Sequence, residues 1–315
     1  MEFEHKPVLL RECLEGLDIK ADGIYFDGTV GGAGHSREIA ARLDAAKGGR
    51  LICADRDPEA VAVSRERLEG LPAEVFEGNY DEIASILARA AADRVNGILL
   101  DLGVSSYQLD NAERGFSYHS DAPLDMRMSS SGLSARDVVN GYDYKSLVRV
   151  LYEYGEEKFA PRIAQAIVNR REQAPVETTG ELADIVREAV PQKARRDKNP
   201  CKKTFQAIRI EVNDEFGHLD RALDSCFDAL AEGGRLCVIT FHSLEDRIVK
   251  QRFRRFCQGC VCPPDFPQCV CGRTPSARLV SRKPLEACDD ELAQNPRSRS
   301  AKLRVLEKIK ERYPD

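Results

Sequence analysis

Three short apolar segments that each end in an aspartate constrain the fold of this chain most strongly. They are Ile24–Asp27, Leu51–Asp55 and Ile98–Asp101, and segments with helical spacing lie between them. Strands that alternate with helices favour a parallel sheet covered by helices on both faces. In such a sheet, ligands bind beyond the carboxyl ends of the strands. We therefore expect the three aspartates at one edge of the sheet, where a ligand can reach them.

The alternation of strands and helices stops after Asp101. Residues 105–135 are rich in Ser, Asp, Gly and Met, which is typical of an ordered loop, and residues 144–194 have helical spacing without strands. Thr178 and Glu181 have the spacing of a capping box at the start of one of these helices. A helical stretch that interrupts an α/β pattern predicts an inserted helical domain.

The α/β pattern resumes in the last third of the chain. Residues 210–230 predict one long helix, which ends at the C′ glycine of Gly233–Gly234 before a fifth strand over residues 236–241. A helix over residues 244–256 and a final strand over 303–306 follow. The expected domains are a first part of the sheet domain at 1–107, an inserted helical substrate-recognition domain at 108–209, and the second part of the sheet domain at 210–315.

The glycine-rich turn after the first aspartate predicts a site for a ribose-bearing ligand. Its glycines let a ligand approach the backbone closely, because glycine has no Cβ. Asp55, at the end of the second strand, is placed to accept both hydroxyls of a ribose. The pyrophosphate of a dinucleotide would lie unfavourably near Asp27 and Asp101, whereas the sulfonium and ammonium of S-adenosylmethionine suit these carboxylates. S-adenosylmethionine is therefore favoured over a nicotinamide cofactor. The alternative is that the three acids only terminate strands and cap helices.

Longer motifs make the chain resemble one family over nearly its whole length, from His5 to about Lys308. The block at Pro123–Met128 is far more specific than a glycine-rich turn. Together the motifs resemble the RsmH/MraW family of bacterial 16S rRNA (cytosine-N4) methyltransferases. The segments that carry the resemblance are Asp27–Ser36 (DGTVGGAGHS), Asp55–Pro58 (DRDP), Leu99–Ser106 (LLDLGVSS), Arg114–Ser117 (RGFS), Pro123–Met128 (PLDMRM), Tyr154–Glu157 (YGEE), Thr204–Arg209 (TFQAIR), Phe241–Arg247 (FHSLEDR) and Asn295–Ser300 (NPRSRS).

The resemblance implies a fold, an activity and a set of cofactor contacts. The implied fold is α/β, a class I (Rossmann-like) S-adenosylmethionine-dependent methyltransferase sheet with an inserted all-helical domain. The implied activity is methylation of the exocyclic N4 amine of a single P-site cytidine in the 16S rRNA of the small ribosomal subunit. The implied cofactor contacts are Ala33, Gly34, His35, Asp55, Tyr80, Asp101 and Gln108.

Methyl transfer from a sulfonium needs no metal and no covalent intermediate, so the enzyme mainly orients donor and acceptor. Asp101 is the predicted catalytic residue, because an acceptor for the amine N–H groups stabilises the developing positive charge. His242 is a second catalytic candidate, although a structural histidine bonded to the backbone fits its position equally well. Many amino-methylating enzymes carry an acid- or Asn-Pro-Pro-aromatic tetrad where this chain has Asp101–Val104, so no base-holding aromatic residue is assigned. A nucleophilic cysteine at Cys201, as in carbon-5 cytosine methylation, is disfavoured because Cys201 lies in the insert.

Basic residues gather in two stretches of a chain whose net charge is −5. Residues 193–209 hold seven Lys/Arg against one acid, and residues 235–315 hold 17 against 10. Local basic stretches on an acidic body suit docking to a polyanion, here rRNA. An ordinary solvated surface is the alternative for either stretch alone. The basic side chains expected at the RNA face are Lys193, Arg195, Arg196, Lys198, Lys202 and Lys203, with Arg247, Lys250, Arg252, Arg254 and Arg255.

The composition also bears on the cellular compartment. No apolar run approaches the roughly 18 residues that span a bilayer, and the N-terminal residues are polar and acidic rather than typical of a secretory signal. We therefore expect a cytoplasmic protein without a membrane partner.

Five of the eleven cysteines lie between Cys257 and Cys271, and in a cytosolic chain such clustering favours a metal over disulfides. Four of them form two Cys-x-Cys pairs around a Pro-rich segment, and four thiolates suit a tetrahedral zinc ion that would order a loop without a core. Free thiols in a surface loop are the alternative, and no catalytic role is assigned to the metal. The predicted zinc ligands are Cys260, Cys262, Cys269 and Cys271.

Two other classes of function fit parts of the same pattern. One is a cofactor-gated ribosome assembly factor without turnover, against which the intact cofactor residues argue. The other is a nicotinamide-dependent oxidoreductase, which the strand-end aspartates disfavour. Transfer of label from S-adenosylmethionine to rRNA distinguishes an enzyme from the first, and cofactor-binding calorimetry distinguishes it from the second.

Overall fold

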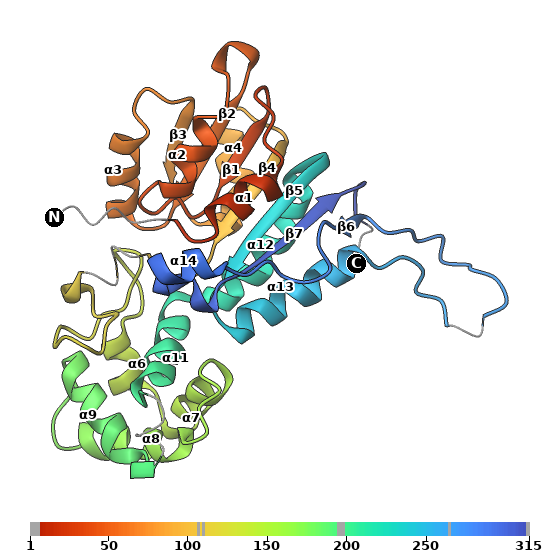
Figure 1. The fold of residues 1–315 in the computed structure, drawn as a ribbon. Helices are drawn as coiled ribbons and strands as arrows, with labels where there is room; N and C mark the ends of the chain where they lie inside the picture. Colours follow the sequence, from red (N-terminus) through yellow and green to blue (C-terminus); the bar gives the residue numbers. More distant parts are fainter. Residues whose placement is uncertain (1–6, 106–107, 109–110, 194–198, 264–265, 313–315) are drawn as a thin grey trace. The chain divides into compact units, whose positions relative to one another are not determined.

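The computed structural model describes residues 7–105, 108, 111–193, 199–263 and 266–312, and the chain divides into two compact units (Figure 1). The sheet unit comprises Met1–Gly103 and Gly217–Asp315, and the helical unit comprises Val104–Phe216. The sheet unit has two hydrophobic cores, one on each face of its sheet, and the helical unit has a core of its own. Among the described residues, none of the helices combines the length and the apolar character needed to cross a membrane.

The sheet unit is built on seven strands in the order β3-β2-β1-β4-β5-β7-β6. The chain adds β2 and β3 on one side of β1, then crosses to add β4 and β5 on the other side. This reversal between β1 and β4 is the point at which parallel α/β sheets bind ligands. The topology confirms the expected Rossmann-like α/β fold. The strands are β1 (Ile24–Asp27), β2 (Arg50–Asp55), β3 (Ala73–Glu77), β4 (Val95–Asp101), β5 (Leu230–Thr240), β6 (Ala277–Leu279) and β7 (Lys302–Lys308).

The sheet is mixed rather than wholly parallel. Strands β1 to β5 pair in parallel, whereas β7 runs antiparallel to both β5 and β6. The sequence pattern of β7 does not reveal its direction, because Leu303 and Val305 become buried whichever way the strand runs. The expected parallel pattern therefore holds for strands β1 to β5 and fails at β7.

Helices cover both faces of the sheet, as the apolar strands predict. Successive residues of a strand point to opposite faces, and accordingly Leu99 joins one core while Leu100 joins the other. One core contains residues of α4, α12 and α13, and the other contains residues of α1 and α2. The helices are α1 (Leu10–Leu17), α2 (Gly34–Ala40), α3 (Pro58–Arg67), α4 (Ile83–Arg89), α12 (Glu215–Ala229), α13 (Ser243–Phe256) and α14 (Asp289–Gln294).

The prediction of a single helix over residues 210–230 is wrong. Two helices occupy this region, α11 (Cys201–Asn213) and α12, and they are separated at Asp214, which has a left-handed φ of 45°. Aspartate tolerates this conformation better than most residues, so the apolar spacing continues across the break and conceals it. Helix α11 also runs across the 209/210 boundary that the sequence suggested, and the units meet after Phe216. Gly233, expected as a C′ glycine, instead lies within β5 with a φ of 79°, where the register with β4 shifts.

The described part of the helical unit contains helices and loops without a regular strand. Among the described residues, its apolar positions join in one core that includes residues of five helices. The capping box predicted at Thr178 is confirmed, because the Glu181 amide donates to its Oγ1 at 3.2 Å and its amide donates to the Glu181 carboxylate at 3.3 Å. The helices are α6 (Ala135–Gly141), α7 (Tyr144–Glu153), α8 (Ala160–Arg171), α9 (Thr179–Ala189) and α11.

Candidate active site

The turn after β1 packs so closely against its neighbours that only glycine fits at its start. A Cβ on Gly28 would lie 2.7 Å from the Leu100 Cδ2 and 2.7 Å from the Tyr80 Cβ. The Gly28 amide donates to the Leu99 carbonyl at 3.0 Å, which extends the β1–β4 pairing into the turn. Tyr80, a half-buried residue after β3, is thereby placed beside the strand ends.

Asp27 is buried at the end of β1 and is held by hydroxyl and amide donors. Its Oδ2 accepts from the Ser36 hydroxyl at 2.5 Å, and its Oδ1 accepts from the Thr29 amide at 3.1 Å. Burial raises the pKa of Asp27. The Thr29 hydroxyl in turn accepts from the Asp101 amide at 2.7 Å, so this threonine ties the end of β1 to the end of β4. Sequence reasoning missed Thr29, although its spacing from Asp27 is typical of an Asx turn.

Asp55, at the end of β2, shapes the glycine-rich turn. Its Oδ2 accepts from the Gly31 amide and its Oδ1 from the Asp57 amide, each at 2.9 Å. Gly31 has a left-handed φ of 49°, which glycine adopts without strain. Burial raises the pKa of Asp55 to about 6, against the opposing effect of the two amide donors. Each carboxylate oxygen has two lone pairs, so Asp55 can still accept further hydrogen bonds.

The predicted contacts Ala33, Gly34 and His35 lie at the start of α2. Ala33 has a left-handed φ of 62°, a strained conformation of the kind that clusters at functional sites. A Cβ on Gly34 would lie 2.6 Å from the Pro7 Cγ. His35 is buried, and its Nε2 lies 2.9 Å from the Val8 carbonyl, which requires the hydrogen to be on Nε2. Its Nδ1 faces Asp101 Oδ2 at 3.7 Å.

Asp101, at the end of β4, has one carboxylate oxygen without a hydrogen-bond partner among the described residues. This oxygen, Oδ1, is buried. Burial is the main cause that raises the pKa of Asp101 to about 8, and the charges of Asp27 and Glu245 add to the effect. A buried acceptor without a partner costs about 1–3 kcal/mol. The Asp101 carboxyl group is therefore available to a cation or to N–H donors.

His242, the second catalytic candidate, caps helix α13. Its Nδ1 accepts from the Glu245 amide at 3.4 Å, and its Nε2 lies 3.0 Å from Glu245 Oε1. The other Glu245 oxygen accepts from the amides of Phe241 and His242, which completes a capping box. These contacts give His242 a structural role, and its catalytic role stays a prediction. Sequence reasoning missed the buried Glu245, although the His-x-x-Glu spacing matches a capping box.

Gln108 and Cys201 belong to the helical unit. Gln108 is buried, and its side-chain Oε1 accepts from the Ser105 backbone amide at 3.1 Å. The backbone N–H of Gln108 donates to the Ser105 hydroxyl at 3.2 Å. Its contact with a cofactor stays a prediction. Cys201 is fully buried, and burial raises the pKa of its thiol, which makes it a poor nucleophile.

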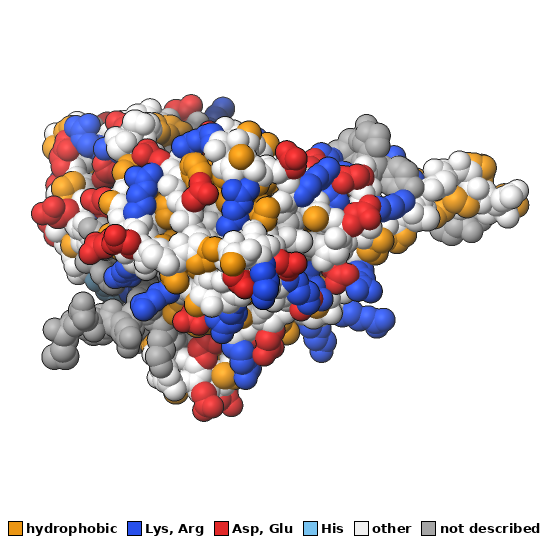
Figure 2. All heavy atoms as spheres, turned by 90° about the horizontal axis from the view of Figure 1, so that it is seen from above, with side chains coloured by type: hydrophobic (Ala, Val, Ile, Leu, Met, Phe, Trp, Pro, Cys, Tyr) orange, Lys and Arg blue, Asp and Glu red, His pale blue; other side chains and the backbone are white. Residues whose placement is uncertain are grey.

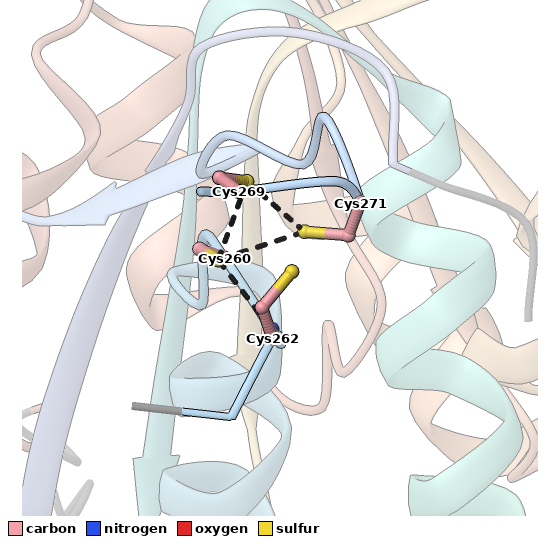
Figure 3. A group of neighbouring side chains, drawn as sticks. All are labelled: Cys260, Cys262, Cys269 and Cys271. Atoms are coloured by element: carbon pink, nitrogen blue, oxygen red, sulfur yellow. Dashed lines mark hydrogen bonds between the residues drawn. The ribbon is translucent and has the colours of Figure 1, made fainter. Parts of the chain in front are cut away.

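The four cysteines predicted as zinc ligands come together in the loop between α13 and β6 (Figure 3). Their sulfur atoms all lie within 4.8 Å of one another. The fifth cysteine of this stretch, Cys257, lies apart from them as the C-cap of α13 and packs against the core of the sheet unit.

The basic side chains predicted to face RNA differ in their surroundings. Lys202 is exposed in the first turn of α11, whereas the Lys203 ammonium donates to the Glu156 carbonyl at 2.7 Å. On α13, Lys250 is exposed, and Arg252 pairs with two acids, Asp220 and Asp224. Figure 2 shows Lys and Arg side chains interspersed with Asp and Glu on the visible face. The exposed side chains also include Lys193, Arg247, Arg254 and Arg255, while Arg195, Arg196 and Lys198 lie outside the described residues.

Comparisons with known proteins extend the similarity well beyond the strand ends. A family model described as the MraW methylase family matches residues 2–309. The chain is 53% identical over 315 residues to a protein of Ruminiclostridium cellulolyticum named ribosomal RNA small subunit methyltransferase H, covering 98% of this chain and 100% of the relative. A Clostridium botulinum protein of the same name is 51% identical over 311 residues, with the same two coverages. Among solved structures, an rRNA methylase from Streptococcus thermophilus aligns with a TM-score of 0.42 and 10% identity, covering 97% of this chain and 98% of that one.

The family model covers both the strand-end motifs and the helical unit. Half of all positions are identical to the relatives over almost the full length of each chain. The chain therefore belongs to the MraW methylase family.

Proposed function

We propose that this protein transfers a methyl group from S-adenosylmethionine to the exocyclic N4 amine of a single P-site cytidine in the 16S rRNA of the small ribosomal subunit. The relatives' shared name, a methyltransferase of small-subunit ribosomal RNA, supports the substrate class. The observation that carries the proposal is the unpartnered buried oxygen of Asp101, at the strand switch point and beside a second buried carboxylate, Asp27.

The side chains at the strand ends fit S-adenosylmethionine. Asp55 retains lone pairs for the ribose hydroxyls, and the negative charge of Asp101 and Asp27 suits a cationic ligand. Tyr80 lies half-buried beside the turn, and its ring is proposed to stack on adenine. When bound, S-adenosylmethionine supplies an electrophilic methyl group. The residues proposed to hold it are Ala33, Gly34, His35, Asp55, Tyr80, Asp101 and Gln108.

Asp101 is the proposed catalytic residue. In its ionised form, its carboxylate accepts hydrogen bonds from the amine N–H groups and stabilises the positive charge that develops on N4. Its raised pKa, about 8, also suits it to take up the proton that the amine must lose. His242 is the alternative acceptor for this proton, and its contacts with Glu245 would first have to break.

The proposed reaction is tested by incubating the protein with methyl-labelled S-adenosylmethionine and small subunits that lack the modification. Nucleoside mass spectrometry should then find N4-methylcytidine at one position. Subunit binding without label transfer would instead identify a non-catalytic assembly factor. Calorimetric binding of a nicotinamide cofactor in place of S-adenosylmethionine would identify an oxidoreductase.

Asp55→Ala should weaken S-adenosylmethionine binding. Losing hydrogen bonds to a charged acceptor costs about 1.5–3 kcal/mol, which raises the dissociation constant roughly ten- to hundredfold. Calorimetry measures the change, and Asp22→Ala, which removes an exposed acid of the same unit, serves as the control. An unchanged dissociation constant in Asp55→Ala would remove this residue from the site.

Lys202→Ala should weaken binding to the small subunit and flatten its salt dependence. Each lost phosphate contact lowers the log–log slope by roughly 0.7–0.9. Cofactor affinity should stay the same, because Lys202 belongs to no strand-end motif. Lys203→Ala is measured separately, since it also removes the hydrogen bond to the Glu156 carbonyl.

The control for the Lys202 experiment is Lys145→Ala, which removes an exposed lysine of α7 in the same unit. Subunit binding is measured at several salt concentrations for both variants. If Lys202→Ala leaves the slope unchanged and lowers only cofactor affinity, the assignment of the insert as an RNA-docking face is wrong.

A further inference from the structure

The described residues of the loop between α13 and β6 form no hydrophobic core of their own. The Ser276 amide donates to the Phe256 carbonyl at 3.0 Å, so the intervening residues leave and rejoin the sheet unit at one point. The loop extends away from the rest of this unit (Figures 1 and 2). Its apolar side chains are exposed, with Val261 at 47%, Phe266 at 51% and Val270 at 73%. Apolar burial therefore cannot offset the conformational entropy lost on ordering this loop.

The cysteine sulfur atoms of the loop are spaced as the ligands of a single metal ion. Cys260 Sγ lies 3.4 Å from Cys269 Sγ, and Cys271 Sγ lies 3.7 Å from each of them. A tetrahedral zinc ion with Zn–S bonds of about 2.3 Å places its sulfur ligands about 3.8 Å apart. Cys262 completes the set, because all four sulfur atoms lie within 4.8 Å of one another.

The valines between the cysteines indicate which way each Cys-x-Cys pair faces. The two cysteines of each pair direct their sulfur atoms to the shared centre in Figure 3. Val261 and Val270, which separate them, are exposed to solvent instead. An arrangement driven by apolar burial would turn the valines inward and leave the thiols outside. Cys260 and Cys269 are themselves exposed, so burial of the side chains does not explain why the four sulfur atoms converge. Their convergence points to a ligand at the sulfur centre.

Backbone amides support the sulfur atoms from outside the centre. The Cys262 amide donates to Cys260 Sγ and the Val270 amide donates to Cys262 Sγ, each at 3.4 Å. Hydrogen bonds of this kind orient metal ligands and favour their ionised form. The Val270 amide also joins the two arms of the loop, so both arms contribute to one centre.

We propose that Cys260, Cys262, Cys269 and Cys271 bind one structural zinc ion that folds this loop. Four thiolates replace four thiols on binding, and their protons pass to solvent. Four thiolates this close would repel one another without a cation, and the divalent ion compensates their charge. The closeness of the sulfur atoms leaves room for a single ion rather than for an iron–sulfur cluster. The proposal does not rest on the proposed methyl transfer.

The full-length protein, purified without metal-affinity steps, tests the proposal by elemental analysis. We expect near-stoichiometric zinc in the wild type and background zinc in the double variant Cys269→Ser/Cys271→Ser. Cys257→Ser and Cys288→Ser are the matched controls and should retain zinc, because these cysteines lie outside the cluster. Replacing the zinc by cobalt should give the intense visible absorption of tetrahedral cobalt with thiolate ligands.

A second readout follows the folding of the loop itself. Trypsin should cleave after Arg273 faster in the zinc-depleted protein and in the double variant than in the zinc-bound wild type, and re-addition of zinc should restore protection of the depleted wild type only. The proposal is overturned by any of three results: no metal with all four thiols freely titratable, two disulfides in the protein purified under reducing conditions, or zinc retained by the double variant.

Discussion

Replacing Asp101 by asparagine should reduce the methyl-transfer rate by two to three orders of magnitude while leaving the fold intact. Removing one preorganised electrostatic partner of a transition state costs roughly 10²- to 10³-fold in kcat. Asparagine keeps the shape of the side chain, but it carries no negative charge and cannot take up the amine proton. Single-turnover transfer from labelled S-adenosylmethionine to small subunits measures the effect.

The same variant should lose a pH dependence of cofactor binding. The pKa of Asp101 is about 8 in the cofactor-free protein, and a cationic ligand prefers the ionised carboxylate. Below about pH 8, each decrease of one pH unit lowers the ionised fraction of Asp101 by up to tenfold. The affinity of the wild type for the cofactor falls by the same factor. The other titratable groups near this carboxyl include Asp27, His35 and Glu245, and the buried thiol of Cys13. The Asp55 carboxyl, with a pKa of about 6, adds a further loss of affinity at lower pH.

Calorimetry between about pH 4.5 and 9 distinguishes these contributions. The dependence between about pH 6 and 8 should disappear in Asp101→Asn, whereas the loss below about pH 6 should remain. If the variant keeps the full pH dependence, a different group controls the binding of the cation.

Thermal unfolding without cofactor provides an independent check on Asp101. A carboxyl whose pKa is raised from about 4 in the unfolded chain to about 8 in the folded chain destabilises the fold progressively across that range. Asp101→Asn removes this cost, so its gain in melting temperature should be absent below about pH 4 and largest above about pH 8. A variant that is destabilised at alkaline pH would contradict the raised pKa.

The strand ends could be predicted from the sequence because each apolar run stops at its acid. The predicted bounds of Ile24–Asp27 agree with β1, and the predicted strand at 98–101 is the end of β4, which begins earlier at Val95. The family motifs then implied the fold class, which the strand order confirms. Strand ends and motifs are formed by residues that are close together in the chain, so a single sequence is enough to predict them.

The features that escaped prediction depend on the backbone path or on distant partners. Asp214 divides the expected long helix through one left-handed residue, and Ala33 adopts a similar conformation without being glycine. The Thr29 hydroxyl meets the Asp101 amide only because β1 and β4 are neighbours. The capping contacts of His242 are an exception, because their partner Glu245 lies only three residues along the chain, at the spacing of a capping box.

Asn213→Ala should destabilise the helical unit by about 2–5 kcal/mol. Asn213 is buried at the end of α11, where its Oδ1 accepts from the Met128 amide at 2.8 Å. Its Nδ2 donates to the carbonyls of Met126 at 2.8 Å and of Arg209 at 2.9 Å. Met126 has a left-handed φ of 60°, so the asparagine holds a strained segment of the motif Pro123–Met128 in place. Alanine would leave the buried Met128 amide and the buried Met126 carbonyl without their hydrogen bonds to Asn213.

Asn140 provides a matched control for this effect, because its side chain likewise bonds to backbone amide and carbonyl groups but at a half-exposed position. Its Nδ2 donates to the carbonyls of Arg136 and Val176 at 2.9 Å each, and its Oδ1 accepts from the Val176 amide at 2.8 Å. Water can replace these bonds in Asn140→Ala, so its loss should stay near 1 kcal/mol. Amide hydrogen exchange of the helical unit measures both variants, and Asn213→Ala should accelerate exchange about thirtyfold or more. Equal effects of the two substitutions would show that burial of the Asn213 partners does not set the stability of the Pro123–Met128 segment.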